Sequence, residues 1–217
     1  MSHETILDRV ARCAVVPVIA IEKVEAAIPL ADALLEAGLP VIEITFRTAA
    51  AAEVIRKISQ ERPQMTIGAG TVLTSANLEV ALAGGAAFAI APGLNPMIVR
   101  HAQELGLPFF PGIATPTDIE MGLALGCKLL KLFPAEALGG VAMLEALSAP
   151  YKHTGVRFMP TGGVNPANLE SYLRLDTVAA VGGTWIARKE DLAAGKWREI
   201  SSRAKAAVAI AAKVRGR

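Results

Sequence analysis

Residues 15–46 read VVPVIAIEKVEAAIPLADALLEAGLPVIEITF, two short apolar runs on either side of an amphipathic segment. In that segment Leu30, Leu34 and Leu35 have helical spacing. Gly38 follows, and a glycine in this place commonly ends a helix. The two outer runs are apolar along almost their whole length, which is typical of parallel strands covered on both faces. The pattern therefore predicts a strand–helix–strand unit.

The same alternation continues along the chain, with successive apolar runs beginning roughly 20 to 30 residues apart. Eight such units predict one domain over residues 1–217, folded as an α/β (β/α)8 TIM barrel with an extra N-terminal helix at Glu4–Arg12. A doubly wound open sheet is the alternative, but its usual glycine-rich first turn is replaced here by Ile19–Lys23. The candidate strands are Val15–Ile21, Val41–Phe46, Met65–Val72, Phe88–Pro92, Pro108–Ala114, Lys128–Phe133, Arg157–Thr161 and Thr177–Val181.

The composition excludes several classes of protein. A net charge of +2 and a pI near 8.6 do not describe the dense basic surface of a nucleic-acid-binding protein. The longest uncharged stretch, Val80–Val99, contains glycines and prolines that rule out a continuous membrane helix. Cys13 and Cys127 lie in apolar surroundings, as buried thiols do in a reducing compartment. We therefore expect a cytoplasmic protein with no nucleic-acid or membrane partner.

The candidate strand at residues 41–47 combines an acid and a base. Successive side chains of a strand point to opposite faces, so Glu43 and Arg47 share one face. Burying both groups is costly unless they have a function, although a structural ion pair inside the barrel would give the same pattern. The side toward the helices is expected to carry Ile42, Ile44 and Phe46, and the side toward the barrel axis Val41, Glu43, Thr45 and Arg47.

Lys131 lies in the middle of the apolar candidate strand Lys128–Phe133. It shares a face with Leu129 and Phe133, whereas Lys128 at the start of the strand is expected to reach solvent. Burial favours the neutral amine of a lysine, and a neutral amine near a carbonyl carbon is a Schiff-base nucleophile. From the chemistry alone, such a lysine could equally bind a phosphate or stabilise an enolate.

Two pairs of glycines follow the last two candidate strands, within Pro160–Val164 and Val181–Trp185. Paired glycines let backbone N–H groups converge on an anion without obstruction by Cβ atoms. In α/β barrels the loops after strands seven and eight often hold phosphate, so we expect a phosphate site here, with tight turns that bind nothing as the alternative. Gly68–Thr71 ends the third candidate strand, and the Thr71 hydroxyl is expected to face the pocket.

With these residues identified, the sequence resembles the family of 2-keto-3-deoxy-6-phosphogluconate (KDPG) and 4-hydroxy-2-oxoglutarate aldolases over essentially its whole length. The resemblance implies a class I aldolase, a carbon–carbon lyase that cleaves KDPG to pyruvate and glyceraldehyde 3-phosphate and also acts on 4-hydroxy-2-oxoglutarate. It further implies a homotrimer and a reaction that needs no metal and no other cofactor. The most specific matches are Glu43–Thr48, Gly68–Val72, Ala91–Gly93, Lys131–Glu136 and Pro160–Gly163.

The resemblance also implies a role for individual residues. Lys131 matches the lysine that forms the imine with C2 of the keto acid, and Glu43 matches the carboxylate that moves protons. The substrate-binding positions are matched by Arg47 and Thr71 for the carboxylate, Pro92 and Phe133 for the apolar walls around the pyruvyl group, and Gly162, Gly163 and Thr184 for the phosphate.

Two positions depart from the family's usual pattern. Thr184 stands where the family commonly has Ser, which keeps the hydroxyl and adds a methyl group beside the phosphate. Phe46 replaces a more usual aliphatic residue on the side toward the helices, where only packing is expected to change. Glu136 belongs to the motif that begins at Lys131 but lies beyond the end of the strand, so we expect a structural role for it.

Three alternatives remain at this point. A 2-keto-3-deoxy-6-phosphogalactonate aldolase shares the chemistry, but those sequences tend to have Asn and Ser where this chain has Gly93 and Ala135. A phosphosugar isomerase or epimerase would share the phosphate turns, use Lys131 for charge stabilisation and form no covalent adduct with pyruvate. A non-catalytic phosphate-binding barrel would have no use for Glu43, Arg47 and Lys131 together.

Overall fold

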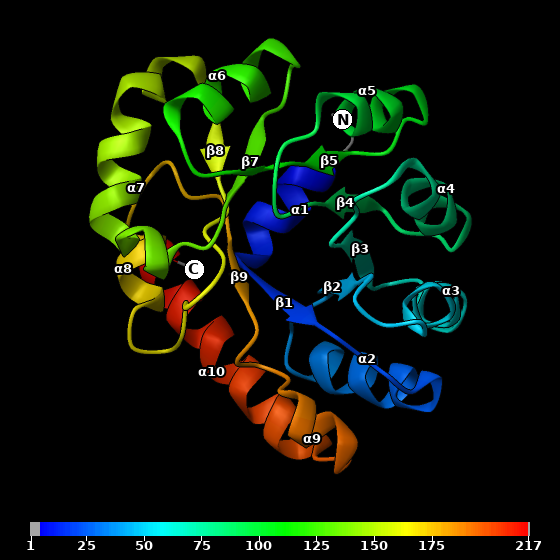
Figure 1. Cartoon of the computed structure of the whole chain (residues 1–217). Coiled ribbons are helices and arrows are strands. Elements are labelled where there is room, and N and C mark those ends of the chain that lie inside the picture. The colour runs from blue at the N-terminus through cyan, green and yellow to red at the C-terminus, as the bar shows by residue number, and fades with distance from the viewer. Residues whose placement is uncertain (1–4, 217) are drawn as a thin grey trace.

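Short parallel strands alternate with helices along the chain. The computed structural model describes residues 5–216, and the strands lie inside with most of the helices around them (Figure 1). The strands are β1 (Val15–Ile19), β2 (Val41–Thr45), β3 (Thr66–Gly70), β4 (Phe88–Ile90), β5 (Phe109–Phe110), β6 (Gly112–Ile113), β7 (Leu129–Leu132), β8 (Arg157–Phe158) and β9 (Val181–Gly183).

The strands pair in two sheets, and every pairing is parallel. One sheet has the order β5-β4-β3-β2-β1-β9 and the other has the order β6-β7-β8. Two isolated parallel bridges, Phe158–Val178 and Thr161–Gly182, join the segments of β8 and β9. The parallel α/β class predicted from the sequence is therefore confirmed.

Helices follow the strands and cover their outward sides (Figure 1). No helix among residues 5–216 is long and apolar enough to cross a membrane. The helices are α1 (Ile6–Cys13), α2 (Ala27–Glu36), α3 (Ala51–Glu61), α4 (Ser75–Ala83), α5 (Pro96–Glu104), α6 (Pro116–Ala124), α7 (Gly140–Ser148), α8 (Leu169–Leu173), α9 (Lys189–Ala193) and α10 (Trp197–Arg215), with 3-10 turns η1 (Val24–Ala26), η2 (Glu136–Leu138) and η3 (Ala149–Thr154).

Helix α1 precedes β1 and has a clear start. The Thr5 hydroxyl accepts the N–H of Asp8 at 3.2 Å, and the Asp8 carboxylate accepts the N–H of Thr5 at 3.1 Å. This reciprocal capping satisfies backbone donors that a helix start otherwise leaves unpaired. The predicted start at Glu4 lies outside the described residues.

The fifth candidate strand, Pro108–Ala114, is divided into β5 and β6 by Pro111. Proline has no N–H to donate to a ladder, so a strand cannot continue regular pairing through it. The carbonyl of Pro111 still accepts the N–H of Lys131 at 2.8 Å. As a result β5 pairs with β4, whereas β6 pairs with β7, and the two sheets meet at this residue.

The last strand was placed wrongly by the sequence pattern, which predicted Thr177–Val181 followed by a glycine turn. Strand β9 instead contains both glycines, and they pair with β1. A Cβ atom at Gly182 would lie 2.2 Å from the Thr161 hydroxyl oxygen, and one at Gly183 would lie 2.2 Å from the Trp185 ring. These glycines permit close packing and do not form an N–H turn.

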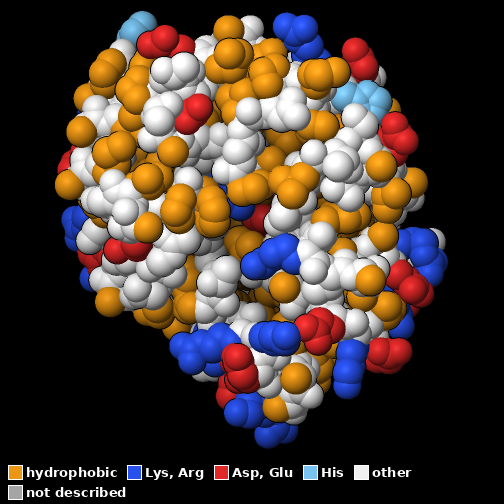
Figure 2. Space-filling model, viewed as in Figure 1, with side chains coloured by type: hydrophobic (Ala, Val, Ile, Leu, Met, Phe, Trp, Pro, Cys, Tyr) orange, Lys and Arg blue, Asp and Glu red, His pale blue; other side chains and the backbone are white. Residues whose placement is uncertain are grey.

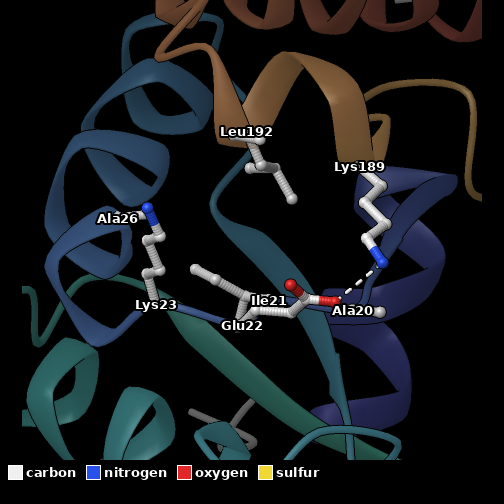
Figure 3. Close-up of a pocket in the computed structure, with 8 residues that line it drawn as sticks. Ala20, Ile21, Glu22, Lys23, Ala26, Lys189 and Leu192 are labelled. Atoms are coloured by element: carbon white, nitrogen blue, oxygen red, sulfur yellow. Dashed lines mark ion pairs between the residues drawn. The ribbon is translucent and has the colours of Figure 1, made fainter.

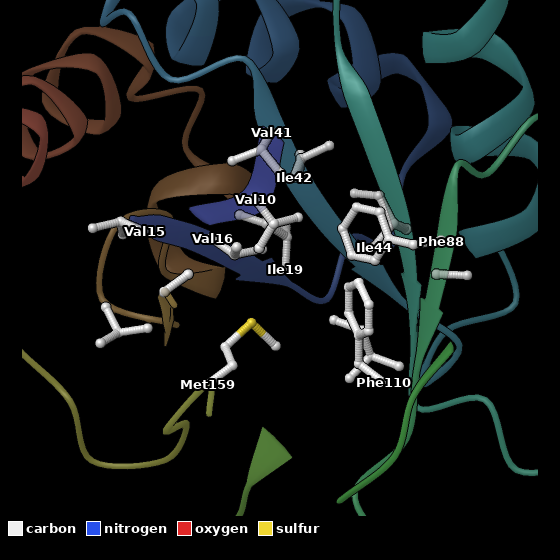
Figure 4. Packing of buried hydrophobic residues seen from close by; sticks show 14 of the residues in the cluster. Val10, Val15, Val16, Ile19, Val41, Ile42, Ile44, Phe88, Phe110 and Met159 are labelled. Atoms are coloured by element: carbon white, nitrogen blue, oxygen red, sulfur yellow. The ribbon is translucent and has the colours of Figure 1, made fainter. Parts of the chain in front are cut away.

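The apolar core joins the strands to the helices. Side chains of Ile19, Phe88 and Phe110 converge within it (Figure 4), and the centroids of the two phenylalanine rings are 5.4 Å apart. Burying one such side chain stabilises the fold by about 1.5–3 kcal/mol. A Cβ atom at Gly68 would lie 2.2 Å from the Phe88 ring, so the glycine makes room for it. The packed strands hold their ends in fixed positions.

Candidate active site

All the site residues predicted from the sequence lie in strands or in the segments that directly follow them. Polar side chains at the carboxyl ends of parallel strands are the usual functional groups of α/β folds. Lys131 and Glu43 lie within β7 and β2; Arg47 follows β2, Thr71 follows β3, Pro92 follows β4, Phe133 follows β7, Gly162 and Gly163 follow β8, and Thr184 follows β9.

Lys131 and Glu43 face each other from different sheets. Lys131 is 4% exposed and Glu43 is fully buried, and their Nζ and Oε1 atoms are 3.5 Å apart. The Lys131 Nζ also lies 5.4 Å from the centroid of the Phe133 ring. A buried amine beside a buried carboxylate can exchange a proton without either group reaching water. The pair is therefore suited to proton transfer during attack on a carbonyl carbon.

Gly70 provides the space for the Glu43 carboxylate. A Cβ atom at Gly70 would lie 2.1 Å from Glu43 Oε1, so even an alanine would displace the carboxylate. The other oxygen, Oε2, is buried and makes no hydrogen bond with the described residues. A buried acceptor without a partner costs about 1–3 kcal/mol. A bound substrate hydroxyl could supply that partner, so the cost suits a working proton acceptor.

Arg47 is exposed at the end of β2, beyond the buried pair. Its Nε donates a hydrogen bond to the Thr45 hydroxyl at 3.1 Å, and that hydroxyl donates to the carbonyl of Ile19 at 3.0 Å. No hydrogen bond within residues 5–216 uses its Nη groups. A guanidinium fixed at Nε in this way presents its remaining donors to a carboxylate.

Thr71 has a backbone conformation that is rare for its side chain. Its φ is 56°, in the left-handed region, where a β-branched residue is an outlier. Such strain costs on the order of 1–3 kcal/mol and commonly occurs at functional sites. The residue is half-buried at the end of β3, next to the glycine that makes room for Glu43. The strain supports a functional position for the Thr71 side chain.

Pro92 is held next to β6, the strand that pairs with the Lys131 strand. A Cβ atom at Gly112 would lie 2.1 Å from the carbonyl of Pro92, and the Gly112 N–H donates to the carbonyl of Gly93 at 3.0 Å. Gly112 is also the register partner of Lys131. The close approach therefore brings the Pro92 segment to the lysine.

The Gly162–Gly163 turn lies next to the Phe133 ring. A Cβ atom at Gly162 would lie 3.4 Å from the Phe133 ring, and both glycines have positive φ values, 97° and 85°. No hydrogen bond within residues 5–216 uses their N–H groups. Thr184 is exposed at the end of β9, whose Gly182 bridges to Thr161 beside the turn. The two segments together can present N–H and hydroxyl donors to an anion.

The surface view shows the open face of the molecule hollowed near its middle, where basic and acidic side chains meet (Figure 2). Close to this face, a small cavity of about 50 Å³ lies between the segment after β1 and α9. Glu22 and Lys189 form an ion pair of 2.8 Å across it, and Leu192 points toward it (Figure 3). The Lys189 ammonium lowers the pKa of the Glu22 carboxyl. The cavity is too small for a sugar acid, and the Glu22–Lys189 ion pair joins the segment after β1 to α9.

Two interactions near the site were not predicted. The Glu22–Lys189 ion pair and the hydrogen bond from Tyr172 to Glu136 join residues far apart in the sequence, and no local motif indicates them. His101 forms surface contacts with two glutamates, and His153 is exposed, whereas His3 lies outside the described residues. No group of three or more His, Cys, Asp or Glu within residues 5–216 could hold a metal ion.

A parallel α/β fold that buries a lysine beside a carboxylate within its strands has the groups that a class I aldolase requires. A family model described as "Aldolase: KDPG and KHG aldolase" matches residues 6–203. The chain therefore belongs to the KDPG and KHG aldolase family, and the resemblance predicted from the sequence is confirmed.

Individual relatives agree with this family. The chain is 46% identical over 198 residues to a 2-dehydro-3-deoxy-phosphogluconate aldolase of Treponema pallidum, covering 91% of this chain and 93% of the relative. It is 44% identical over 194 residues to the KHG/KDPG aldolase of Escherichia coli, covering 89% and 90%.

Solved structures give the same result. A Legionella pneumophila KDPG aldolase, with pyruvate captured as a covalent carbinolamine intermediate, superimposes with a TM-score of 0.89 at 39% identity, covering 93% of this chain and 97% of that one. A structure described as native KDPGal has a TM-score of 0.85 at only 24% identity, so that likeness shows the fold alone.

Proposed function

We propose that this chain cleaves KDPG to pyruvate and glyceraldehyde 3-phosphate, with Lys131 as the Schiff-base nucleophile. The observation that carries the proposal is the buried Lys131–Glu43 pair, with its 3.5 Å separation and the unpaired Oε2 of Glu43. A structural ion pair would gain from satisfying that oxygen, whereas a proton-transfer group needs it available.

In the proposed reaction the Lys131 amine attacks C2 of the keto acid to form a carbinolamine, which loses water to give a protonated imine. The C3–C4 bond then breaks as the C4 hydroxyl loses its proton to Glu43, and the electron pair moves into the imine. The products of this step are an enamine and the aldehyde. Protonation at C3 and addition of water release pyruvate and restore Lys131.

The remaining predicted residues bind the substrate in this proposal. Arg47 and Thr71 hold the carboxylate, which suits the Nη donors of Arg47. Apolar walls from Pro92 and Phe133 enclose the pyruvyl group. The phosphate lies against the N–H groups of Gly162 and Gly163 and the hydroxyl of Thr184, and Gly162 lies close to the Phe133 ring.

A second substrate, 4-hydroxy-2-oxoglutarate, is favoured by the dual name of the Escherichia coli relative. It has the same 2-keto group for Lys131 and the same C4 hydroxyl for Glu43. It is the shorter acid, with its second carboxylate directly next to C4, so it leaves the phosphate site empty and needs none of the donors of the glycine turn.

The architecture we propose for this function is one domain over residues 1–217, a closed (β/α)8 barrel with α1 as an additional N-terminal helix. The bridges between the β8 and β9 segments and the partner change at Pro111 support closure at both junctions of the two sheets. We also place the enzyme in the cytoplasm, where a buried thiol such as Cys127 stays reduced.

We further propose a homotrimer. Large apolar side chains are exposed on the neighbouring segments of α4 to α6, and Met97 is the most exposed of them at 78%. Exposed apolar side chains are common at protein–protein interfaces. The exposed apolar side chains of this region are Leu73, Val80, Leu82, Met97 and Met121.

Reductive trapping tests the proposed function. The protein is incubated with pyruvate and borohydride, and the modified peptide is located by mass spectrometry. A stable adduct on Lys131 is expected, together with loss of the adduct and of turnover in a folded Lys131→Ala variant. Absence of an adduct in the wild-type protein would favour a phosphosugar isomerase, and turnover by Lys131→Ala would contradict the Schiff-base mechanism.

A further inference from the structure

Glu136 and Tyr172 form a hydrogen-bonded pair beside the Gly162–Gly163 turn. The proposed reaction gives this pair no role. Tyr172 lies on α8 and is fully buried, and its hydroxyl donates a hydrogen bond to Glu136 Oε1. Glu136 is the first residue of η2, which follows the Lys131 strand. The bond therefore links the segment after β7 to the helix that follows the glycine turn.

Glu136 contacts the glycine turn through both its backbone and its side chain. Its N–H donates to the carbonyl of Gly162 at 3.0 Å. A Cβ atom at Gly163 would lie 2.5 Å from both Cβ and Cγ of Glu136, so the side chain lies directly on Gly163. Movement of the Glu136 side chain would therefore remove its packing against Gly163 and leave only the backbone bond to Gly162.

The opposite side of the turn is fixed by asparagines. The side-chain amides of Asn165 and Asn168 donate to the carbonyl of Gly163 at 3.1 Å and 3.3 Å. The carbonyl is thus held while the N–H groups of the turn are available to a ligand. A turn fixed in advance loses little conformational entropy when an anion binds.

The Glu136 carboxylate would repel a bound phosphate if it turned toward it. A Cβ atom at Gly140 would lie 3.0 Å from Glu136 Oε1 and 3.5 Å from the Tyr172 hydroxyl, so the carboxylate oxygen is packed between Tyr172 and α7. Burial raises the pKa of the Tyr172 hydroxyl, and the bond to Glu136 raises it further. The hydroxyl therefore remains a donor at neutral pH and holds the charge away from the turn.

We propose that the Glu136–Tyr172 pair positions the Gly162–Gly163 turn for the substrate phosphate and so sets the preference for phosphorylated over unphosphorylated keto acids. The inference rests on the proposed phosphate role of the turn. Both are positioning residues, because neither touches the reacting atoms.

The Tyr172→Phe variant removes the hydrogen bond with little change in buried volume. Its KM for KDPG is expected to rise about tenfold, because a hydrogen bond to a charged acceptor contributes a factor of this size. The pyruvate concentration that half-saturates borohydride labelling of Lys131 is the phosphate-free comparison, and it is expected to stay unchanged. Tyr151→Phe is the matched control, because it removes a tyrosine–glutamate bond of 3.1 Å to Glu120 on the surface.

Variants of the glutamate test the same bond from its other side. Glu136→Gln keeps an acceptor for Tyr172 and is expected to retain the wild-type KM for KDPG, whereas Glu136→Ala is expected to raise it. An unchanged KM in Tyr172→Phe and Glu136→Ala, or an equal loss for KDPG and pyruvate, would overturn the inference. Failure of the wild-type protein to form a pyruvate adduct would instead overturn the proposed function, so the two failures are distinguishable.

Discussion

The two ends of the proposed substrate site differ in the kind of group they present and in how deeply it is buried. At one end, Lys131 and Glu43 are side chains within strands, 4% and 0% exposed, and they face each other across two sheets. At the other end, Gly162 and Gly163 offer backbone N–H groups from a turn, and Thr184 offers a hydroxyl from an exposed position. The first end excludes water, whereas the second remains in contact with it.

Because of this difference, we expect the chemical step and the selectivity between substrates to depend on different ends of the site. In the proposed reaction, bond-making at the Lys131 end depends on desolvated groups that every keto acid uses. The glycine turn is proposed to contact only the phosphate, so it contributes only when a phosphate is present. Changes at the first end are therefore expected to affect all substrates alike, and changes at the second to discriminate between KDPG and 4-hydroxy-2-oxoglutarate.

Among substitutions that leave Lys131 and Glu43 in place, the largest effect is expected from Gly70→Ala. The new methyl group would lie 2.1 Å from Glu43 Oε1 and displace the carboxylate from Lys131. We expect kcat to fall about 100-fold with both substrates, the contribution of a positioned general acid–base group. Steady-state kinetics with the two substrates measure it, and circular dichroism checks that the variant is folded.

Gly84→Ala is the matched control for that substitution. Its new Cβ atom would lie 3.3 Å from Ile55 Cγ2, at the end of α4 and with an ordinary negative φ of −75°. Wild-type kinetics are expected for it. Full activity of Gly70→Ala, or a loss of activity with only one substrate, would contradict the proposal that the Lys131–Glu43 end acts on all substrates alike.

The burial of Lys131 and Glu43 could be predicted from the sequence because its signals are local. A lysine among leucines and a glutamate among isoleucines, each in a strand pattern, indicate burial and face from their immediate neighbours. Lys131 and Glu43 are both buried in the structure. Their roles follow from the family resemblance, and the trapping experiment tests the role of Lys131.

The supporting contacts of the phosphate end could not be predicted, because they depend on packing between distant segments. The Tyr172–Glu136 bond spans 36 residues and belongs to no motif. Gly182 and Gly183 look like a turn in the sequence, yet they lie in β9, where Thr161 and Trp185 leave no room for a Cβ atom. Whether a glycine pair forms a turn or permits close packing within a strand depends on the neighbouring segments, which the local sequence does not show.

A smaller effect at the carboxylate contact is expected from Thr71→Gly. Glycine relieves the strain of the positive φ of 56° and removes the hydroxyl proposed to bind the substrate carboxylate. The free energy of unfolding is expected to rise by up to about 1 kcal/mol, while KM rises about tenfold for both substrates. Chemical denaturation and kinetics measure the two quantities.

Ala14→Gly is the control for that experiment, because it separates the effect of relieved backbone strain on stability from the effect of the lost hydroxyl on KM. Ala14 has a positive φ of 61° after α1, outside the proposed site, so glycine there should give a similar stabilisation with unchanged kinetics. If Thr71→Gly left both KM values unchanged, the strained threonine would not be a substrate contact.

The smallest effect is expected at Thr184, which is exposed and whose single hydroxyl is proposed to contact the phosphate. Thr184→Ala should raise the KM for KDPG several-fold and leave that for 4-hydroxy-2-oxoglutarate unchanged, because only KDPG carries the phosphate. Thr184→Ser keeps the hydroxyl and removes the methyl group, so its KM for KDPG should equal or fall below the wild-type value. A rise in KM for both substrates in Thr184→Ala would place this residue at the reacting end and remove the distinction between the two ends.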